Sequence, residues 1–207
     1  MNSALARLLL TVAVAATAAA AANPQAGKDK AESERCLECH GQAGPAQGFS
    51  QGIDGKLARL DGQYAEYLVK QVRDFRSGAR KHDFMSMMAN SVDDADLADI
   101  AAWFASQPAP ATTPAPDAVA QRLISQSDPA RGLIACATCH GADGAGSAGG
   151  AAAGPKLKGQ GKAYLAQQLQ EWRSGWRANS PGGVMNQQAR ALTDAEISAL
   201  ARYLSGQ

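Results

Sequence analysis

The chain has 207 residues, of which 45% are hydrophobic but only 5% aromatic. This length allows one medium domain or two small domains. Two small domains would have little hydrophobic core and would need an additional stabilising group or bond. Its formal net charge is +1. This balance excludes the strongly basic surface by which proteins hold nucleic acids, and we expect no nucleic-acid partner.

The N-terminus has the pattern of an export signal. A short segment containing Arg7 precedes an apolar run over residues 8–22, and the small residues at its end suit cleavage after Ala22. The alternative is an uncleaved anchor, but the 15 residues of this run fall short of the roughly 20 that a spanning helix needs. We therefore expect residues 1–22 to be a signal peptide and the mature chain to be a soluble periplasmic protein.

An internal repeat divides the rest of the chain. The proline-rich residues 108–116 read as a semi-rigid linker between residues 23–107 and residues 117–207. Within the two halves, GQYAEYLVKQVRDFRSG (62–78) aligns with GQGKAYLAQQLQEWRSG (159–175) at an offset of 97. The halves carry formal charges of −3 and +3, which we interpret as solvated helix faces. The repeat predicts two tandem domains.

Each half reads as three helices without any alternating strand pattern, so the predicted fold class is all-α. The first helix runs into the cysteine motif described below. The second carries an apolar stripe, over residues 64–75 in one half and 164–172 in the other. The third begins at Asp93 in the first half, and in the second half Thr193 and Glu196 form a capping box at its start.

All four cysteines and two of the three histidines lie in two copies of one short pattern, CLECH (36–40) and CATCH (136–140). Cysteines at i and i+3 with a histidine at i+4 share one helical turn, so two thiols can add to the vinyl groups of a haem while the imidazole reaches its iron. A thioredoxin-like site would need a βαβ context, and disulfides would leave the histidines unexplained. A zinc site would need its ligands brought together across the linker.

The motifs therefore predict two covalently bound haem c groups, one in each half. A covalently bound haem would also stabilise the small hydrophobic core of each half. The predicted attachment residues are Cys36, Cys39, Cys136 and Cys139, and the predicted proximal iron ligands are His40 and His140.

These motifs, each followed by a GQ…Y…(F/W)RSG…M pattern, resemble the dihaem cytochrome c4 group over nearly all of residues 30–207. The resemblance implies two fused class I cytochrome c domains, each wrapped around one haem, in a monomeric electron carrier rather than an enzyme. It implies redox protein partners in the respiratory membrane, a bc1-type donor and a haem–copper oxidase acceptor, and leaves peripheral membrane association open.

Two alternative functions stay open from the sequence. The first is an electron-accepting subunit dedicated to one periplasmic dehydrogenase. The second is a dihaem peroxidase, which would need an iron with an open distal position and nearby acid–base groups.

The second axial ligands are predicted to be methionines, as the resemblance implies. Met185 is the only methionine of the second half, and Met85 is its equivalent at an offset of 100. Met87 and Met88 are alternatives that we interpret as core packing. His82 could compete as a second imidazole ligand, but its charged context is typical of a surface histidine.

The two halves differ beside the proximal histidines. The resemblance implies that the carbonyl of Pro155 accepts a hydrogen bond from the second ring nitrogen of His140. The first half has Ala58 at the equivalent place, where we expect a less fixed loop and hence a different haem potential. The low-complexity stretch 141–154 reads as flexible filler.

Overall fold

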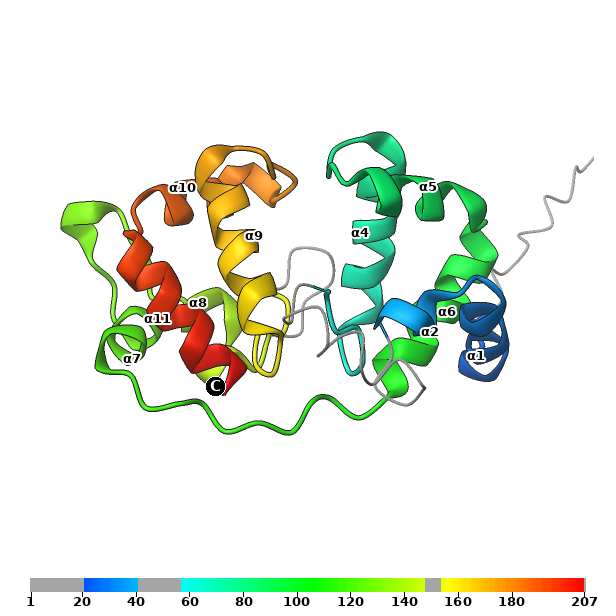
Figure 1. Cartoon of the computed structure of the whole chain (residues 1–207), viewed down its shortest axis with the longest axis horizontal. Helices are drawn as coiled ribbons and strands as arrows, with labels where there is room; N and C mark the ends of the chain where they lie inside the picture. The colour runs from blue at the N-terminus through cyan, green and yellow to red at the C-terminus, as the bar shows by residue number, and fades with distance from the viewer. Residues whose placement is uncertain (1–20, 41–56, 148–153, 207) are drawn as a thin grey trace, which may run out of the picture.

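The computed structural model describes residues 21–40, 57–147 and 154–206. Within these ranges the chain forms two helical lobes that lie side by side (Figure 1). The described β pairing is limited to an isolated bridge between Asp128 and Leu133, and the prediction of an all-α fold is confirmed. The predicted signal peptide lies almost wholly outside the described residues.

The first lobe is organised around a close crossing of its first and last helices. Its described helices are α1 (Pro24–Ser33), α2 (Cys36–His40), α4 (Ala65–Ser77), α5 (Asp83–Ser91) and α6 (Asp94–Ser106). A Cβ atom on Gly27 of α1 would lie 1.9 Å from the carbonyl oxygen of Asp99 on α6. Only glycine therefore allows the two helices to approach this closely. The carboxylate of Asp99 also accepts a 2.7 Å hydrogen bond from the backbone N–H of Asn23, just before α1.

The second lobe repeats this arrangement. Its described elements are α7 (Ala118–Ser125), η1 (Pro129–Arg131), α8 (Ala137–His140), η2 (Ala142–Gly144), α9 (Lys162–Ser174), η4 (Pro181–Gly183), α10 (Val184–Arg190) and α11 (Asp194–Ser205). The predicted capping box of Thr193 and Glu196 opens α11. Arg131 donates two 2.7 Å hydrogen bonds to the Glu196 carboxylate. The pKa of Glu196 is lowered to about 2, and the hydrogen bonds from Arg131 contribute more to this than the capping bonds from Thr193.

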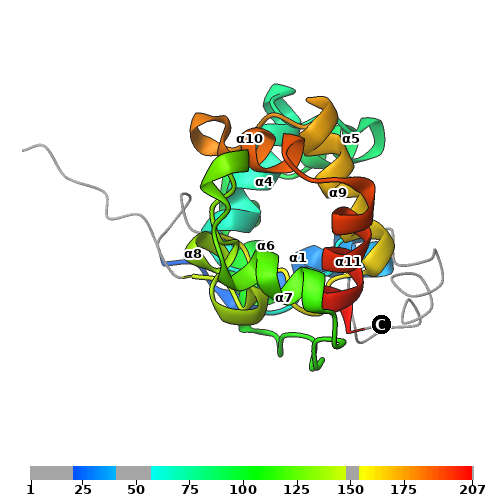
Figure 2. The ribbon, with the colours of Figure 1, turned by 90° about the vertical axis from the view of Figure 1, so that its left-hand side faces the viewer.

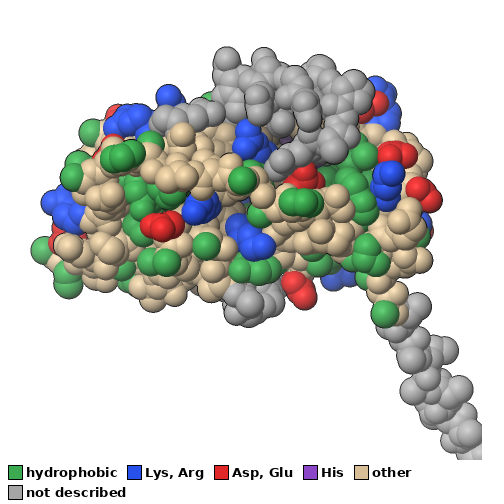
Figure 3. Space-filling view, turned by 90° about the horizontal axis from the view of Figure 1, so that it is seen from below, with side chains coloured by type: hydrophobic (Ala, Val, Ile, Leu, Met, Phe, Trp, Pro, Cys, Tyr) green, Lys and Arg blue, Asp and Glu red, His purple; other side chains and the backbone are tan. Residues whose placement is uncertain are grey.

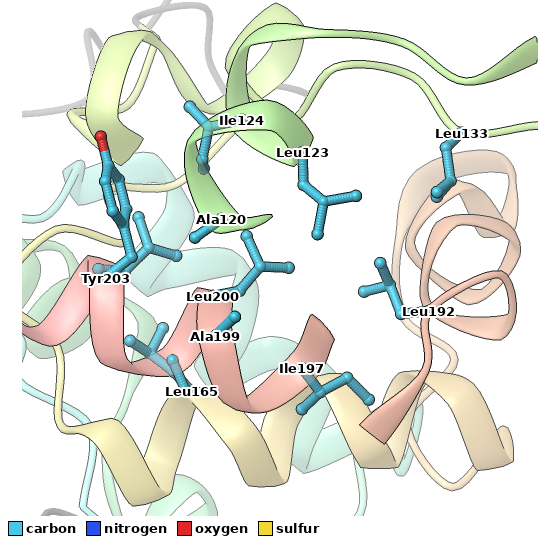
Figure 4. Packing of buried hydrophobic residues seen from close by; sticks show 12 residues of the cluster. Ala120, Leu123, Ile124, Leu133, Leu165, Leu192, Ile197, Ala199, Leu200 and Tyr203 are labelled. Carbon is cyan, nitrogen blue, oxygen red and sulfur yellow. The ribbon is translucent and has the colours of Figure 1, made fainter. Parts of the chain in front are cut away.

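The core of each lobe lies where the first, middle and last helices meet. In the second lobe, Leu123, Leu165 and Leu200 approach one another from α7, α9 and α11 (Figure 4). The cysteine motifs adjoin these cores, because Cys136 packs against the second cluster and Cys36 against that of the first lobe. A group attached to these cysteines is therefore placed beside apolar side chains.

One prediction about the helices is wrong. The first helix of each half does not run into the cysteine motif, because α1 ends at Ser33 and Arg35 has a φ of 59° that interrupts the helix. In the second half, residues 126–135 separate α7 from the motif. The methionine segments, which are not among the three helices predicted for each half, form the short helices α5 (Asp83–Ser91) and α10 (Val184–Arg190).

The lobes meet through an approximately two-fold interface that places α4 opposite α9 (Figure 1). The side-chain amide of Gln63 donates to the carbonyl of Lys156 at 3.0 Å and accepts from its N–H at 3.1 Å. Gln160 makes the same pair of bonds to the main chain of Arg59, at 2.6 and 2.9 Å. At the offset of 97, Gln63 is equivalent to Gln160 and Arg59 is equivalent to Lys156. Each lobe therefore makes the same pair of hydrogen bonds to the other lobe.

The linker crosses below the interface and is fixed to the second lobe. Thr112 donates its hydroxyl to the carbonyl of Ser205 at 3.2 Å, and the N–H of Ala115 donates to the carbonyl of Tyr203 at 3.3 Å. Seen along the line that joins the lobes, the second lobe lies in front of the first (Figure 2). On the linker face, charged side chains of both signs are spread among hydrophobic and other residues (Figure 3). The predicted domain boundaries stay predictions.

Candidate functional site

Each cysteine–histidine motif forms a single helical turn. In the first lobe, α2 begins at Cys36 and ends at His40. In the second, the N–H of His140 donates to the carbonyl of Cys136 at 2.9 Å, which closes the same turn. The structure therefore brings each predicted set of two cysteines and one histidine together on one short element.

The first thiol of each motif is held in its neutral form by burial. Burial raises the pKa of Cys36 to about 11, and it also raises the pKa of Cys136, so both thiols stay neutral at pH 7. The four cysteines, all of which are described, form no disulfide. The described part of the chain holds no cluster of three or more metal-ligating side chains. Because Cys36 and Cys136 also pack against the apolar cores, the motifs fit covalent attachment of an apolar cofactor better than a zinc site.

Both predicted proximal histidines are oriented by a backbone carbonyl. The Nδ1 atom of His40 lies 2.7 Å from the carbonyl oxygen of Ala58, and that of His140 lies 2.9 Å from the oxygen of Pro155. A proton on Nδ1 makes each bond and leaves Nε2 free to bind a metal ion. Burial is the main cause that lowers the pKa of both imidazoles, so they stay neutral. The residues therefore fit a haem iron, and the acceptor expected from Pro155 is present, with its counterpart at Ala58.

The predicted methionine ligands occupy matching places at the starts of α5 and α10. Met85 and Met185 are both partly buried. The backbone N–H of Met85 donates to Nδ1 of His82 at 3.2 Å, and that of Met185 donates to the hydroxyl of Ser180 at 3.2 Å. His82 is exposed and caps α5, as expected of a surface histidine. The interpretation of Met87 as core packing is wrong, because its side chain is 61% exposed.

Sequence reasoning missed how the glycine-rich stretch supports the second motif. A Cβ on Gly154 would lie 1.9 Å from the carbonyl oxygen of Cys139, so glycine is required for this close approach. The hydroxyl of Tyr203 on α11 donates to Asp143 at 2.6 Å, and this bond is the main cause that raises the pKa of Tyr203 to about 12. Both described ends of the stretch are therefore held; residues 148–153 lie outside the described residues. The Gly-Pro pair at residues 154 and 155 is the sequence feature that could have indicated this close approach of the backbone to the second motif.

Comparison with known proteins gives consistent matches. The family model for cytochrome c matches residues 130–207. Cytochrome c4 of Thiocapsa roseopersicina is 37% identical over 187 residues, which span 89% of this chain and 92% of that protein. A thiosulfate dehydrogenase electron acceptor of Thiomonas intermedia is 35% identical, spanning 85% of this chain and 80% of that protein. The solved structure of reduced recombinant cytochrome c4 from Pseudomonas stutzeri has a TM-score of 0.75 and 32% identity, spanning 90% of this chain and 99% of that one.

Proposed function

This chain belongs to the cytochrome c4 family and is thus an electron-transfer cytochrome with two covalently bound haem c groups. We propose that it carries one haem on each cysteine–histidine turn and relays electrons between periplasmic redox proteins. The observation that carries this proposal is the pair of matched turns, each with a carbonyl-oriented histidine. The proposed ligand sets are Cys36, Cys39, His40 and Met85 in the first lobe, and Cys136, Cys139, His140 and Met185 in the second.

The protein residues set the conditions for one-electron chemistry, which bound haem c supplies as the ferric and ferrous states of its iron. The carbonyls of Ala58 and Pro155 hold the imidazoles in one tautomer and orientation. A methionine sulfur is neutral and soft, so Met85 and Met185 would favour the ferrous state and raise the potential relative to a second imidazole. The helices packed around each site would hold these side chains in place in both states of a bound haem.

We also propose that the protein is not itself an enzyme. The relatives are named as electron carriers or electron acceptors. With Met85 and Met185 bound to the irons as proposed, neither haem would have an open position for a peroxide. His82, the remaining histidine, is exposed and caps a helix, and therefore does not supply an acid–base group inside the site.

Two partner classes fit this carrier. The first is a membrane respiratory pair, a bc1-type donor and a haem–copper oxidase acceptor, served by a monomeric periplasmic shuttle. The second is a dedicated dehydrogenase, favoured by the relative named as a thiosulfate dehydrogenase electron acceptor. Stopped-flow reduction of the protein by purified thiosulfate dehydrogenase and by a bc1 complex, at matched ionic strength, distinguishes them. The true donor should reduce it much faster and with a salt-dependent rate.

The cofactor assignment is tested by optical spectroscopy of the protein matured in a host that attaches haem c. We expect two haems per chain, both low-spin, and a far-red methionine–iron charge-transfer band. Met85→Leu and Met185→Leu should each remove half of this band, whereas the exposed control Met87→Leu should leave it unchanged. A full band in Met85→Leu would contradict the assignment in the first lobe.

A further inference from the structure

The loop before Met185 is longer than its counterpart in the first lobe. Arg80 and Arg177 are equivalent at the offset of 97, whereas Met85 and Met185 are equivalent at the offset of 100. The second lobe therefore has three more residues between the end of α9 and its methionine, in a loop that contains η4 (Pro181–Gly183). A longer loop has more conformations to lose, so this methionine needs more anchoring from its surroundings.

The start of this loop is fixed at the interface between the lobes. Arg177 is 5% exposed and donates to the side-chain oxygen of Gln71 at 3.0 Å. The side-chain amide of Asn179 donates to the same oxygen at 3.1 Å, and its backbone carbonyl accepts from Lys70 at 2.9 Å. Both partners lie on α4 of the first lobe, so the loop leaves the interface from a fixed point.

The helix at the other end of the loop is weakly held by its own residues. With seven residues, α10 is too short to be stable without packing. Its N-cap, Gly183, gives no side-chain hydrogen bond, and the N–H of Met185 bonds only Ser180 of the same loop. Ala189 is fully buried and holds the far end. In the first turn, which carries Met185, the buried residue is the polar Asn186.

Asn186 ties this first turn to the end of α9, which lies beside α10 (Figure 1). Its Nδ2 atom donates to the carbonyl of Trp172 at 2.7 Å and to that of Arg177 at 2.8 Å. The side-chain amide has two N–H donors, and both are used. The side chain is 7% exposed, so water competes little for these bonds. The residue next to Met185 is therefore bound both to the last turn of α9 and to the fixed start of the loop.

The first lobe has no such tie. Ser86 is the equivalent of Asn186 at the offset of 100, and a hydroxyl has one donor rather than two. Within the ranges that the structure describes, the side chain of Ser86 makes no hydrogen bond. The start of α5 is capped by His82 instead. The two bonds of Asn186 thus accompany the longer loop of the second lobe.

We propose that Asn186 is a positioning residue that holds Met185 in place as the axial ligand of the second haem. This inference rests on the proposed function, because it takes Met185 as an iron ligand. Asn186 acts through the helical turn that it shares with Met185 and is not itself a ligand. Without its two bonds, the first turn of α10 would be free to move away from α9. A competing ligand from solution would then displace the methionine sulfur more easily.

The test is an imidazole titration of the ferric full chain with both haems attached, followed by the far-red methionine–iron band. In a Met85→Leu parent the remaining band reports Met185 alone. Asn186→Leu, added to this parent, keeps the approximate side-chain shape but removes both donors. Two ordinary hydrogen bonds correspond to about a 30-fold change in an equilibrium constant. We therefore expect the imidazole concentration that removes half of the band to fall about 30-fold. Asn186→Ser keeps one donor and should lower it about fivefold.

The matched control is Gln187→Leu in the same parent, because Gln187 is an exposed amide on the same helix. It should leave the imidazole titration unchanged. The proposal is overturned if Asn186→Leu has the same half-displacing concentration as the parent, or if the control falls as far. It is also overturned if Asn186→Leu weakens the second lobe in urea unfolding while its imidazole titration is unchanged, since the role of Asn186 would then be structural only.

Two further comparisons keep the outcome clear. If Asn186→Leu does not accumulate with both haems, Asn186→Ser supplies the comparison, and an unchanged titration there overturns the proposal. A Met85→Leu parent without a far-red band would refute the assignment of Met185 and with it the ligand set of the proposed function. A normal parent band with unchanged titrations in the Asn186 variants would refute the positioning role alone.

Discussion

Replacing Gln160 by alanine should loosen the contact between the lobes. Its side chain, 9% exposed, makes hydrogen bonds of 2.6 and 2.9 Å to the main chain of Arg59 in the other lobe. Each bond contributes about 1 kcal/mol net, and a buried main-chain group left without a partner costs about 1–3 kcal/mol. With partial rescue by water, we expect Gln160→Ala to weaken docking of the lobes by about 2–4 kcal/mol.

Amide hydrogen exchange measures this loss at a distance from the substitution. The N–H of Lys156 donates to Gln63, which the substitution does not touch, and it exchanges only when the lobes separate. A weakening of 2–4 kcal/mol should speed its exchange about 30- to 700-fold, at about 1.4 kcal/mol per factor of ten. Gln63→Ala should act similarly on the amide of Arg59, because the two glutamines are exchanged by the approximate two-fold axis.

The matched control is Gln167→Ala on the exposed side of α9, where the glutamine bonds Glu171 at 2.7 Å. Its substitution should leave the Lys156 amide unchanged. The reasoning would be refuted if Gln160→Ala and Gln167→Ala gave the same exchange rate at Lys156. That result would mean that these reciprocal bonds do not hold the lobes together.

Three further outcomes are expected. Arg131 holds the pKa of Glu196 at about 2, against an ordinary 4.5; this stability is present above pH 4.5 and is lost as the pH falls toward 2. Urea unfolding of the second lobe should therefore lose about 3 kcal/mol over that range, and Glu196→Gln should lack this pH dependence. Gly27→Ala should destabilise the first lobe by about 2–3 kcal/mol in thermal unfolding, because its Cβ would meet the carbonyl of Asp99; an unchanged melting temperature would contradict the close crossing. His82→Ala should cost about 1 kcal/mol as a lost cap while the haem spectra stay unchanged; conversion to a high-spin spectrum would instead make His82 a ligand.

The longer helices could be predicted from the sequence, because local signals specify them. The capping box at Thr193 and the N-cap at Asp93 are where the sequence puts them. The short helices α5 and α10 could not be predicted, since segments of 9 and 7 residues are stable only through packing against the rest of the lobe. The break at Arg35 was missed for a similar reason, because nothing in the local sequence requires a positive φ there.

The candidate site was predictable in part. The motif spacing specifies the attachment turns, the family resemblance led to the carbonyl of Pro155, and the repeat led from it to the carbonyl of Ala58. The methionine assignments stay predictions. The interface was not predictable, because glutamine and arginine side chains usually face water. Gln71 and Arg177 are instead buried at 7% and 5% exposure, since the matching face of the other lobe supplies their partners.

The exchange of bonds between equivalent positions has a consequence for each half of the chain taken separately. Arg59 donates to the carbonyl of Gly159 at 2.7 Å, and Lys156 donates to the carbonyl of Gly62, so these long cations too are matched across the axis. Such a surface is complementary to itself, as in the isologous contacts of symmetric homodimers. One unduplicated half already holds every group that this contact needs. Two separate copies of such a half would therefore have complementary surfaces without any tether, and the linker over residues 108–116 adds only the covalent connection between them.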